Sequence, residues 1–255
     1  MSRAHRAPTL DESVYRDVRS LPEMWSIVAT RFANIVAVHD PHSTPEVKLT
    51  YAQLYEQMQR FAAGLQALGI QADPSENIPP RVALFSDNCS RWLIADQGIM
   101  QAGAVDVVRG SQADPAELKY ILEHSGAIGL IVQDLELFRK LRSFLDDVPV
   151  QFVILLNEEQ VPEDSIKVLT FAQVIQLGQS TQLSPAQQDR TTLATLMYTS
   201  GTSGMPKGVM LSHGNLLYQV MGAYTVAQPQ PGERVLSILP IWHCYERSFE
   251  YFIFS

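Results

Sequence analysis

Cysteine is scarce in this 255-residue chain, which contains two of them and no CxxC spacing or His/Cys cluster. We therefore expect no structural zinc site, and a reduced, cytoplasmic setting is the default for so few thiols. The chain also lacks an apolar run of 18 residues, so no segment is expected to span a membrane, while contact with a membrane surface stays open. The basic amino-terminal residues are followed by no apolar stretch, which argues against a secretory signal.

An excess of basic charge is missing as well. The chain has 19 Lys and Arg against 27 Asp and Glu, a formal net charge of −8. Such a chain does not attract nucleic acid through its overall field, although a local basic pocket for phosphates remains compatible with it. With 46% hydrophobic and 18% charged residues, the composition is typical of a soluble globular protein.

Helix and strand patterns alternate along the first two thirds of the chain. Apolar residues at spacings of four and three predict a helix that starts after Thr50 as N-cap and ends at Gly69. Beyond it, near-continuous apolar runs of strand length are separated by helical segments; they lie at 81–86, 105–108, 127–133 and 150–156. This pattern predicts an α/β fold whose parallel sheet is covered by helices on both faces.

The organisation that we predict has three parts. Residues 1–20 are a flexible lead, residues 21–190 an N-terminal α/β subdomain, and residues 191–255 the incomplete start of a second α/β subdomain. If that start stands alone, the apolar faces of residues 194–199, 235–242 and 249–254 are left partly uncovered.

The densest run of small and hydroxyl residues lies between two strand patterns, in the string YTSGTSGMPKGVMLSHGN at residues 198–215. Its glycines let backbone N–H groups approach a ligand closely, its hydroxyl groups add donors and its lysine adds a positive charge. These features predict a phosphate-binding loop made of Thr199, Ser200, Gly201, Thr202, Ser203, Gly204 and Lys207. Taken alone, a Gly/Ser/Thr cluster is more often a solvated turn.

This loop differs from the P-loop of nucleoside triphosphatases and kinases. In a P-loop the lysine is followed by Ser or Thr and by a helix. Here Pro206 precedes Lys207, Gly208 follows it, and a strand pattern comes next, with a helix beginning only after Ser212 as N-cap. The sequence therefore argues against a P-loop enzyme.

The whole string resembles the signature of the adenylate-forming superfamily, which includes acyl-CoA synthetases, luciferases and nonribosomal adenylation domains. The resemblance implies ATP and Mg²⁺ as cofactors. It also implies a reaction in which a carboxylate attacks the α-phosphate of ATP, giving an acyl adenylate and pyrophosphate, after which a thiol displaces AMP. The seven loop residues are carried over to the role of holding the β- and γ-phosphates.

A second motif, LSILPIWHCYERSFEYF at residues 236–252, is similar to the next signature of that superfamily. By this resemblance, His243 lines the wall between the acyl and nucleotide pockets, and Trp242 contributes to the mouth of the acyl pocket. Ordinary core packing is the alternative for both side chains. Glu246, Arg247 and Glu250 form either a buried ion-pair set or a surface pair on a helix, and we favour a structural role for them.

The strings VDVVRGSQAD (residues 105–114) and WHCYERSFE resemble the long-chain branch, especially the acyl-acyl-carrier-protein synthetases of cyanobacteria and plastids. This implies a long-chain fatty acid as substrate and acyl-carrier protein or coenzyme A as acceptor. The adenine, ribose and magnesium contacts of that superfamily and its catalytic lysine are expected beyond residue 255. We therefore predict an N-terminal part that is inactive alone and pairs with a C-terminal half or a second copy. The alternative is a non-catalytic acyl-binding or interaction module.

Overall fold

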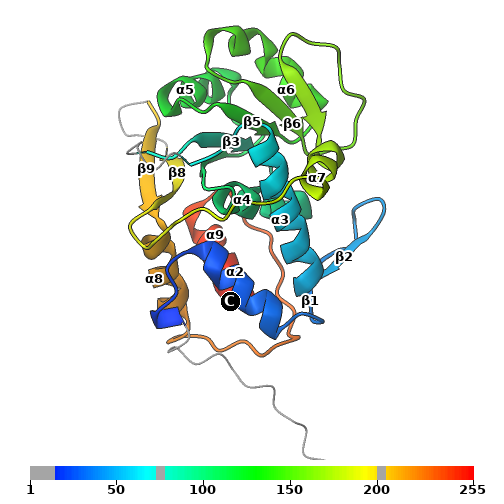
Figure 1. Cartoon of the computed structure of the whole chain (residues 1–255). Coiled ribbons are helices and arrows are strands. Elements are labelled where there is room, and N and C mark those ends of the chain that lie inside the picture. Colours follow the sequence, from blue (N-terminus) through cyan, green and yellow to red (C-terminus); the bar gives the residue numbers. More distant parts are fainter. Residues whose placement is uncertain (1–14, 73–77, 200–204) are drawn as a thin grey trace, which may run out of the picture.

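The computed structural model describes residues 15–72, 78–199 and 205–255. Its centre is a seven-stranded sheet in the order β7-β6-β5-β3-β4-β8-β9 (Figure 1). The strands are β3 (Arg81–Phe85), β4 (Val105–Arg109), β5 (Gly129–Val132), β6 (Phe152–Leu155), β7 (Lys167–Thr170), β8 (Leu193–Thr199) and β9 (Lys207–Ser212). All neighbours pair in parallel except β9, which is antiparallel to β8 at one edge. The parallel α/β fold predicted from the sequence is confirmed.

Helices cover both faces of this sheet (Figure 1). One face carries α3 (Tyr51–Ala67), α4 (Ser90–Gln101) and α7 (Phe171–Gln179), together with α2 (Leu21–Arg31), α8 (His213–Ala223) and α9 (Cys244–Phe254). The other carries α5 (Pro115–Ser125), α6 (Leu135–Leu141) and a 3₁₀ helix at Arg142–Asp147. In β3, Val82 and Leu84 join the first core cluster while Ala83 and Phe85 join the second. Both faces of the strand are buried, which explains its continuous apolar run.

The predicted helix after Thr50 is α3, and its ends follow from local chemistry. Thr50 and Gln53 form a reciprocal capping box at the start. At the far end Gly69 has a φ of 96°, a conformation that favours glycine. A small antiparallel pair, β1 (Val36–Asp40) with β2 (Val47–Thr50), precedes α3 outside the main sheet.

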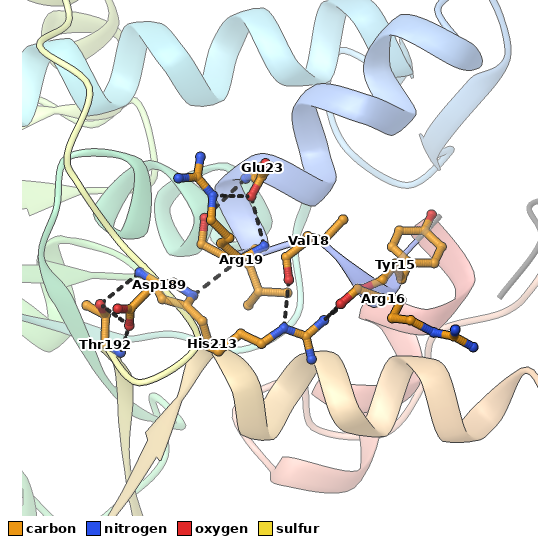
Figure 2. Close-up of polar contacts among 11 residues, drawn as sticks. Tyr15, Arg16, Val18, Arg19, Glu23, Asp189, Thr192 and His213 are labelled. Atoms are coloured by element: carbon orange, nitrogen blue, oxygen red, sulfur yellow. Dashed lines mark hydrogen bonds and ion pairs between the residues drawn. The ribbon is translucent and has the colours of Figure 1, made fainter. Parts of the chain in front are cut away.

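Residues 15–20 pack against the base of the β8–β9 hairpin (Figure 2). The Arg190 guanidinium donates to the carbonyl oxygens of Tyr15 at 2.7 Å and Val18 at 2.8 Å. The buried His213 ring accepts a hydrogen bond from the backbone N–H of Leu21 through Nδ1 at 3.4 Å. Burial lowers the pKa of His213 to about 4, so the ring is neutral at physiological pH. These contacts join the described part of the predicted lead to the sheet.

β8 extends the sheet beyond the predicted subdomain boundary at residue 190, because it pairs in parallel with β4. Since β8 and β4 belong to the same sheet, the pairing does not mark a division at residue 190, and the two subdomains stay a prediction. Ala194, Met197 and Tyr198 of β8 are buried, so the expectation of an uncovered face at residues 194–199 was wrong. At residues 249–254 the expectation is confirmed in part, because Phe249 is exposed while Tyr251 and Phe252 are buried. It is confirmed in the connection between α8 and α9, where Val235, Leu236, Ile238 and Leu239 are exposed.

Candidate functional site

The predicted phosphate loop connects the two strands of the β8–β9 hairpin. Thr199 ends β8 and Lys207 begins β9, and the two residues are cross-strand partners. The register places Tyr198 opposite Gly208 one step below the loop. The other predicted loop residues, Ser200, Gly201, Thr202, Ser203 and Gly204, lie outside the described residues, and their roles stay predictions.

The root of the loop is fixed to α5. The Tyr198 hydroxyl and His124 Nδ1 lie 2.8 Å apart, and the two rings meet edge to face. Tyr198 is buried, and this burial raises its pKa to about 12, so the hydroxyl keeps its proton. Lys207 is exposed, so its ammonium group is free to reach an anion in solvent.

The carboxyl ends of β3 and β4 form the neighbouring part of the same sheet edge. β3 pairs with β4 on one side and β5 on the other, so the order of strand addition reverses between β3 and β5. Such a reversal leaves a crevice in which α/β sheets commonly bind ligands. Just beyond the strand ends, Ser111 Oγ donates to Asp87 Oδ2 at 2.7 Å and ties the two loops together.

Trp242 lies beside the carboxyl end of β4, and His243 follows it at the start of α9. The Trp242 ring is half-buried, and the Arg109 guanidinium at the end of β4 is 4.9 Å from its centroid. His243 is exposed and caps α9, accepting from Tyr245 N–H through Nδ1 at 3.4 Å. His243 is therefore no core histidine. The last pair in the register of β4 and β8 is Val108 with Met197. When this register is extended by two residues, Gly110 lies opposite Thr199.

Arg247 is fully buried, and its partners differ from those that the helical spacing suggests. Its Nη2 contacts the carboxylates of Asp96 in α4 and Asp106 in β4, and its Nη1 donates to Thr195 Oγ1 at 2.8 Å. The Tyr251 hydroxyl completes the cluster by donating to Asp96 Oδ2 at 2.6 Å. The predicted buried ion-pair set thus exists around Arg247, but Asp96 and Asp106 supply the carboxylates.

The sequence held a signal for this cluster. Asp106 lies inside an apolar strand, and Asp96 lies inside a helix that is buried from Trp92 to Gln101. A buried carboxylate requires a cation or a proton. Burial raises the pKa of Asp106 well above its usual range, and the neighbouring Asp96 raises it further against the pull of Arg247. One guanidinium thus stands beside two buried carboxylates, and the pKa of Asp106 is shifted upward because burial outweighs the attraction of Arg247.

Glu250, one turn from Arg247 on α9, contacts the connection that precedes the helix. Ser237 Oγ donates to its carboxylate, and burial raises the pKa of Glu250 to about 7. Glu250 also lines a cavity of about 1290 Å³ between β1, α9 and residues 224–241. Of the predicted site residues that the structure describes, Thr199, Lys207, Trp242 and His243 are not among those lining this cavity.

Two further predictions concern metals and membranes. Among the described residues, no three His, Cys, Asp or Glu side chains are grouped so as to hold a metal ion. The magnesium ligand stays predicted beyond this chain. The helices within the same ranges are too short or too polar to cross a membrane.

A parallel α/β sheet with a Gly/Ser/Thr hairpin loop and an aromatic-histidine pair at its carboxyl edge defines a member of the adenylate-forming fold class. Solved structures share this fold. The adenylation domain of a carboxylate reductase from Mycobacterium chelonae matches with a TM-score of 0.77, 18% identity, and coverage of 97% of this chain and 43% of that one. A long-chain-fatty-acid-CoA ligase from Archaeoglobus fulgidus matches with a TM-score of 0.74 and 19% identity, over 97% of this chain and 46% of that one.

The chain belongs to the AMP-binding enzyme family, whose profile matches residues 26–255. Among its relatives is a chloroplastic long-chain-fatty-acid–[acyl-carrier-protein] ligase of Arabidopsis thaliana, 40% identical over 93% of this chain and 34% of that protein. Long chain acyl-CoA synthetase 8 of the same plant is 28% identical over 81% of this chain and 29% of that protein. The chain thus spans about a third of the length of these relatives.

Proposed function

We propose that this chain supplies the phosphate-binding part of an ATP-dependent ligase, which activates a long-chain fatty acid to an acyl adenylate and then to a thioester. The observation that carries the proposal is the family signature on the β8–β9 hairpin, together with Trp242 packed beside the end of the neighbouring strand β4. Acyl-carrier protein is the acceptor that we favour over coenzyme A. It appears in the name of a relative at 40% identity, whereas the acyl-CoA synthetase above reaches 28%.

The residues divide the work by position. Lys207 and Thr199 face each other where the loop leaves the sheet. There the lysine stabilises the charge that develops on pyrophosphate as it leaves. Ser200, Gly201, Thr202, Ser203 and Gly204 add donors to the same phosphates in this proposal. Magnesium, held by residues beyond this chain, neutralises phosphate charge when bound. In this proposal His243 lines the wall between the fatty acid and the nucleotide, and Trp242 lies at the mouth of the acyl pocket.

The test is release of labelled pyrophosphate from ATP in the presence of palmitate and magnesium. The chain is assayed alone and with a separately supplied C-terminal part of a related ligase. Release only with the added part supports the proposal. Release by the chain alone would show that residues 1–255 suffice and that the expected downstream contacts are dispensable. A folded chain that is inactive in both assays would support the interaction module.

Lys207→Ala is expected to lower the rate of pyrophosphate release about 100-fold or more, because it removes a charge aimed at the leaving group. Palmitate binding should stay within about twofold of the original chain, since Lys207 lies on the phosphate side. Lys167→Ala is the matched control, because Lys167 also opens an edge strand and is exposed. Equal losses in palmitate binding and in rate would overturn the role given to Lys207.

A further inference from the structure

The string VDVVRG ends at the carboxyl edge of the sheet, where β4 lies next to β3. Its last residues, Arg109 and Gly110, follow the buried part of β4, and Asn88 follows β3. Asn88 holds the chain before α9, since its Nδ2 donates to Leu239 O at 2.7 Å and its Oδ1 accepts from Ile241 N at 2.9 Å. Two adjacent strand ends thus fix the segment that carries Trp242.

The Trp242 indole rests directly on the backbone of Gly110. A Cβ atom added at Gly110 would lie 2.5 Å from Trp242 Nε1 and 2.7 Å from Cε2. Any side chain at this position would push the indole away from β4. Glycine is required here for close packing of an aromatic ring on the main chain, and its conformational freedom is not the reason.

Arg109 lies over the ring of the same indole. Its Nε and Nη2 both lie 2.8 Å from Glu117 Oε1, and the Arg109 and Glu117 side chains are 17% and 23% exposed. Glu117 lies in the first turn of α5, so the plane of the guanidinium is set by a rigid element. A guanidinium 4.9 Å from the Trp242 centroid attracts the electron-rich face of the indole.

We propose that Arg109, held by Glu117, is a positioning residue that fixes the Trp242 indole on Gly110 as a rigid wall of the acyl pocket. The acyl part of this inference rests on the proposed function, and the positioning part does not. A long acyl chain has many conformations, and a fixed apolar wall beside the phosphate loop restricts how it lies there. Arg109 thereby acts on the acyl chain through Trp242 and without contacting it.

Acrylamide quenching of tryptophan fluorescence tests the positioning. Trp25 and Trp92 are 0% exposed, so the quenchable emission of the chain comes from Trp242 and should disappear in Trp242→Phe. Arg109→Met and Gly110→Ala should each raise the quenching constant of that component about two- to fivefold. This range is the fold-change that corresponds to the free energy of one exposed cation–π contact. Arg109→Lys keeps a charge for Glu117 but loses the planar stack, so it should fall between the original chain and Arg109→Met.

Arg91→Met is the matched control. Arg91 also lies between a carboxylate and an aromatic ring, with Glu158 at 3.0 Å and the Phe171 centroid at 5.0 Å, away from Trp242. Its substitution should leave Trp242 quenching unchanged. If Gly110→Ala does not fold, Arg109→Met and Glu117→Gln decide the result. Unchanged quenching in both of these folded variants would overturn the positioning role.

Titration with 9,10-dibromostearate tests the acyl part, because bromine quenches tryptophan at contact. In the original chain we expect dibromostearate to quench the Trp242 emission. In Arg109→Met we expect Trp242 to contribute less to the total quenching. Dibromostearate that leaves Trp242 emission unchanged would overturn the acyl part, while the acrylamide result still decides the positioning. Contact quenching without pyrophosphate release would support the wall and count against the ligase reaction, so the two failures are distinguishable.

Discussion

Arg247 and Arg142 each contact two aspartates, but they do so in opposite surroundings. Arg247, Asp96 and Asp106 are all 0% exposed. Arg142 lies at the surface, 2.7 Å from Asp164 Oδ2 and 2.8 Å from Asp146 Oδ1, and the Asp146 side chain is 65% exposed. The groups are chemically the same, so any difference in their effect on stability comes from water.

Burial also reverses the direction of the carboxylate pKa shifts. Hydrogen bonds from the Arg142 guanidinium and from the backbone N–H of Ile166 stabilise the charged form of Asp164 and lower its pKa, and the opposing effect of burial is smaller. Loss of water raises the pKa of Asp106, and the attraction of Arg247 does not compensate for it. A cation beside a carboxylate therefore does not by itself predict an ionised pair. The degree of burial decides in which direction the pKa of the carboxylate shifts.

The largest expected effect is that of Arg247→Met. Methionine has a similar length but leaves Asp96 and Asp106 buried without a cation, which should lower the free energy of unfolding by about 3–5 kcal/mol. Urea unfolding at pH 7, monitored by circular dichroism, measures the change. The variant that also carries Asp96→Asn and Asp106→Asn should recover most of the loss, because no charge then remains buried. A loss below about 1 kcal/mol in Arg247→Met would show that water reaches this cluster.

The two aspartates of the buried cluster should differ from each other. If Asp106 holds the proton, Asp106→Asn replaces a neutral group and should cost about 1 kcal/mol or less. Asp96 accepts from Arg247, Tyr251 and Gln97, so Asp96→Asn removes charged acceptor oxygens and should cost about 1.5–3 kcal/mol. Urea midpoints of the two variants at the same pH give the order. The reverse order would place the proton on Asp96.

Glu250→Gln should change how stability depends on pH. The unfolded carboxyl loses its proton near pH 4.5, whereas the folded one keeps it up to about pH 7. Within this window the folded chain binds more protons than the unfolded chain, so stability falls as pH rises and levels off above it. Gln does not titrate, so the fall should shrink by about 1–3 kcal/mol. Glu123→Gln on α5, where the Glu123 side chain is 46% exposed, should keep the original profile. An equal profile in Glu250→Gln would contradict the assignment.

The same contrast shows what the sequence could reveal. The start of α3 was predictable because Thr50 and Gln53, which cap it, are three residues apart. Arg142 and Asp146 are likewise one helical turn apart. Arg247 is separated from Asp96 by 151 residues and from Asp106 by 141, so only the folded sheet brings them together. The candidate site shows the same difference between local and long-range contacts. The loop motif was visible in one string, whereas Arg109 and Trp242 are far apart in the sequence and meet only in the folded chain.

Arg142→Met should have the smallest effect, below about 1 kcal/mol, because water and salt already screen its partners. The pH dependence of the stability that this ion pair contributes should have the opposite sign to that contributed by Glu250. The lowered pKa of Asp164 contributes stability above the unfolded pKa, and that contribution is lost as pH falls through the folded value. Urea midpoints at about 0.05 M and 0.5 M NaCl check the screening, since the difference between Arg142→Met and the original chain should shrink with salt. A difference that persists at high salt would mean that this surface set acts like the buried one, and burial would then no longer explain the contrast between the two arginines.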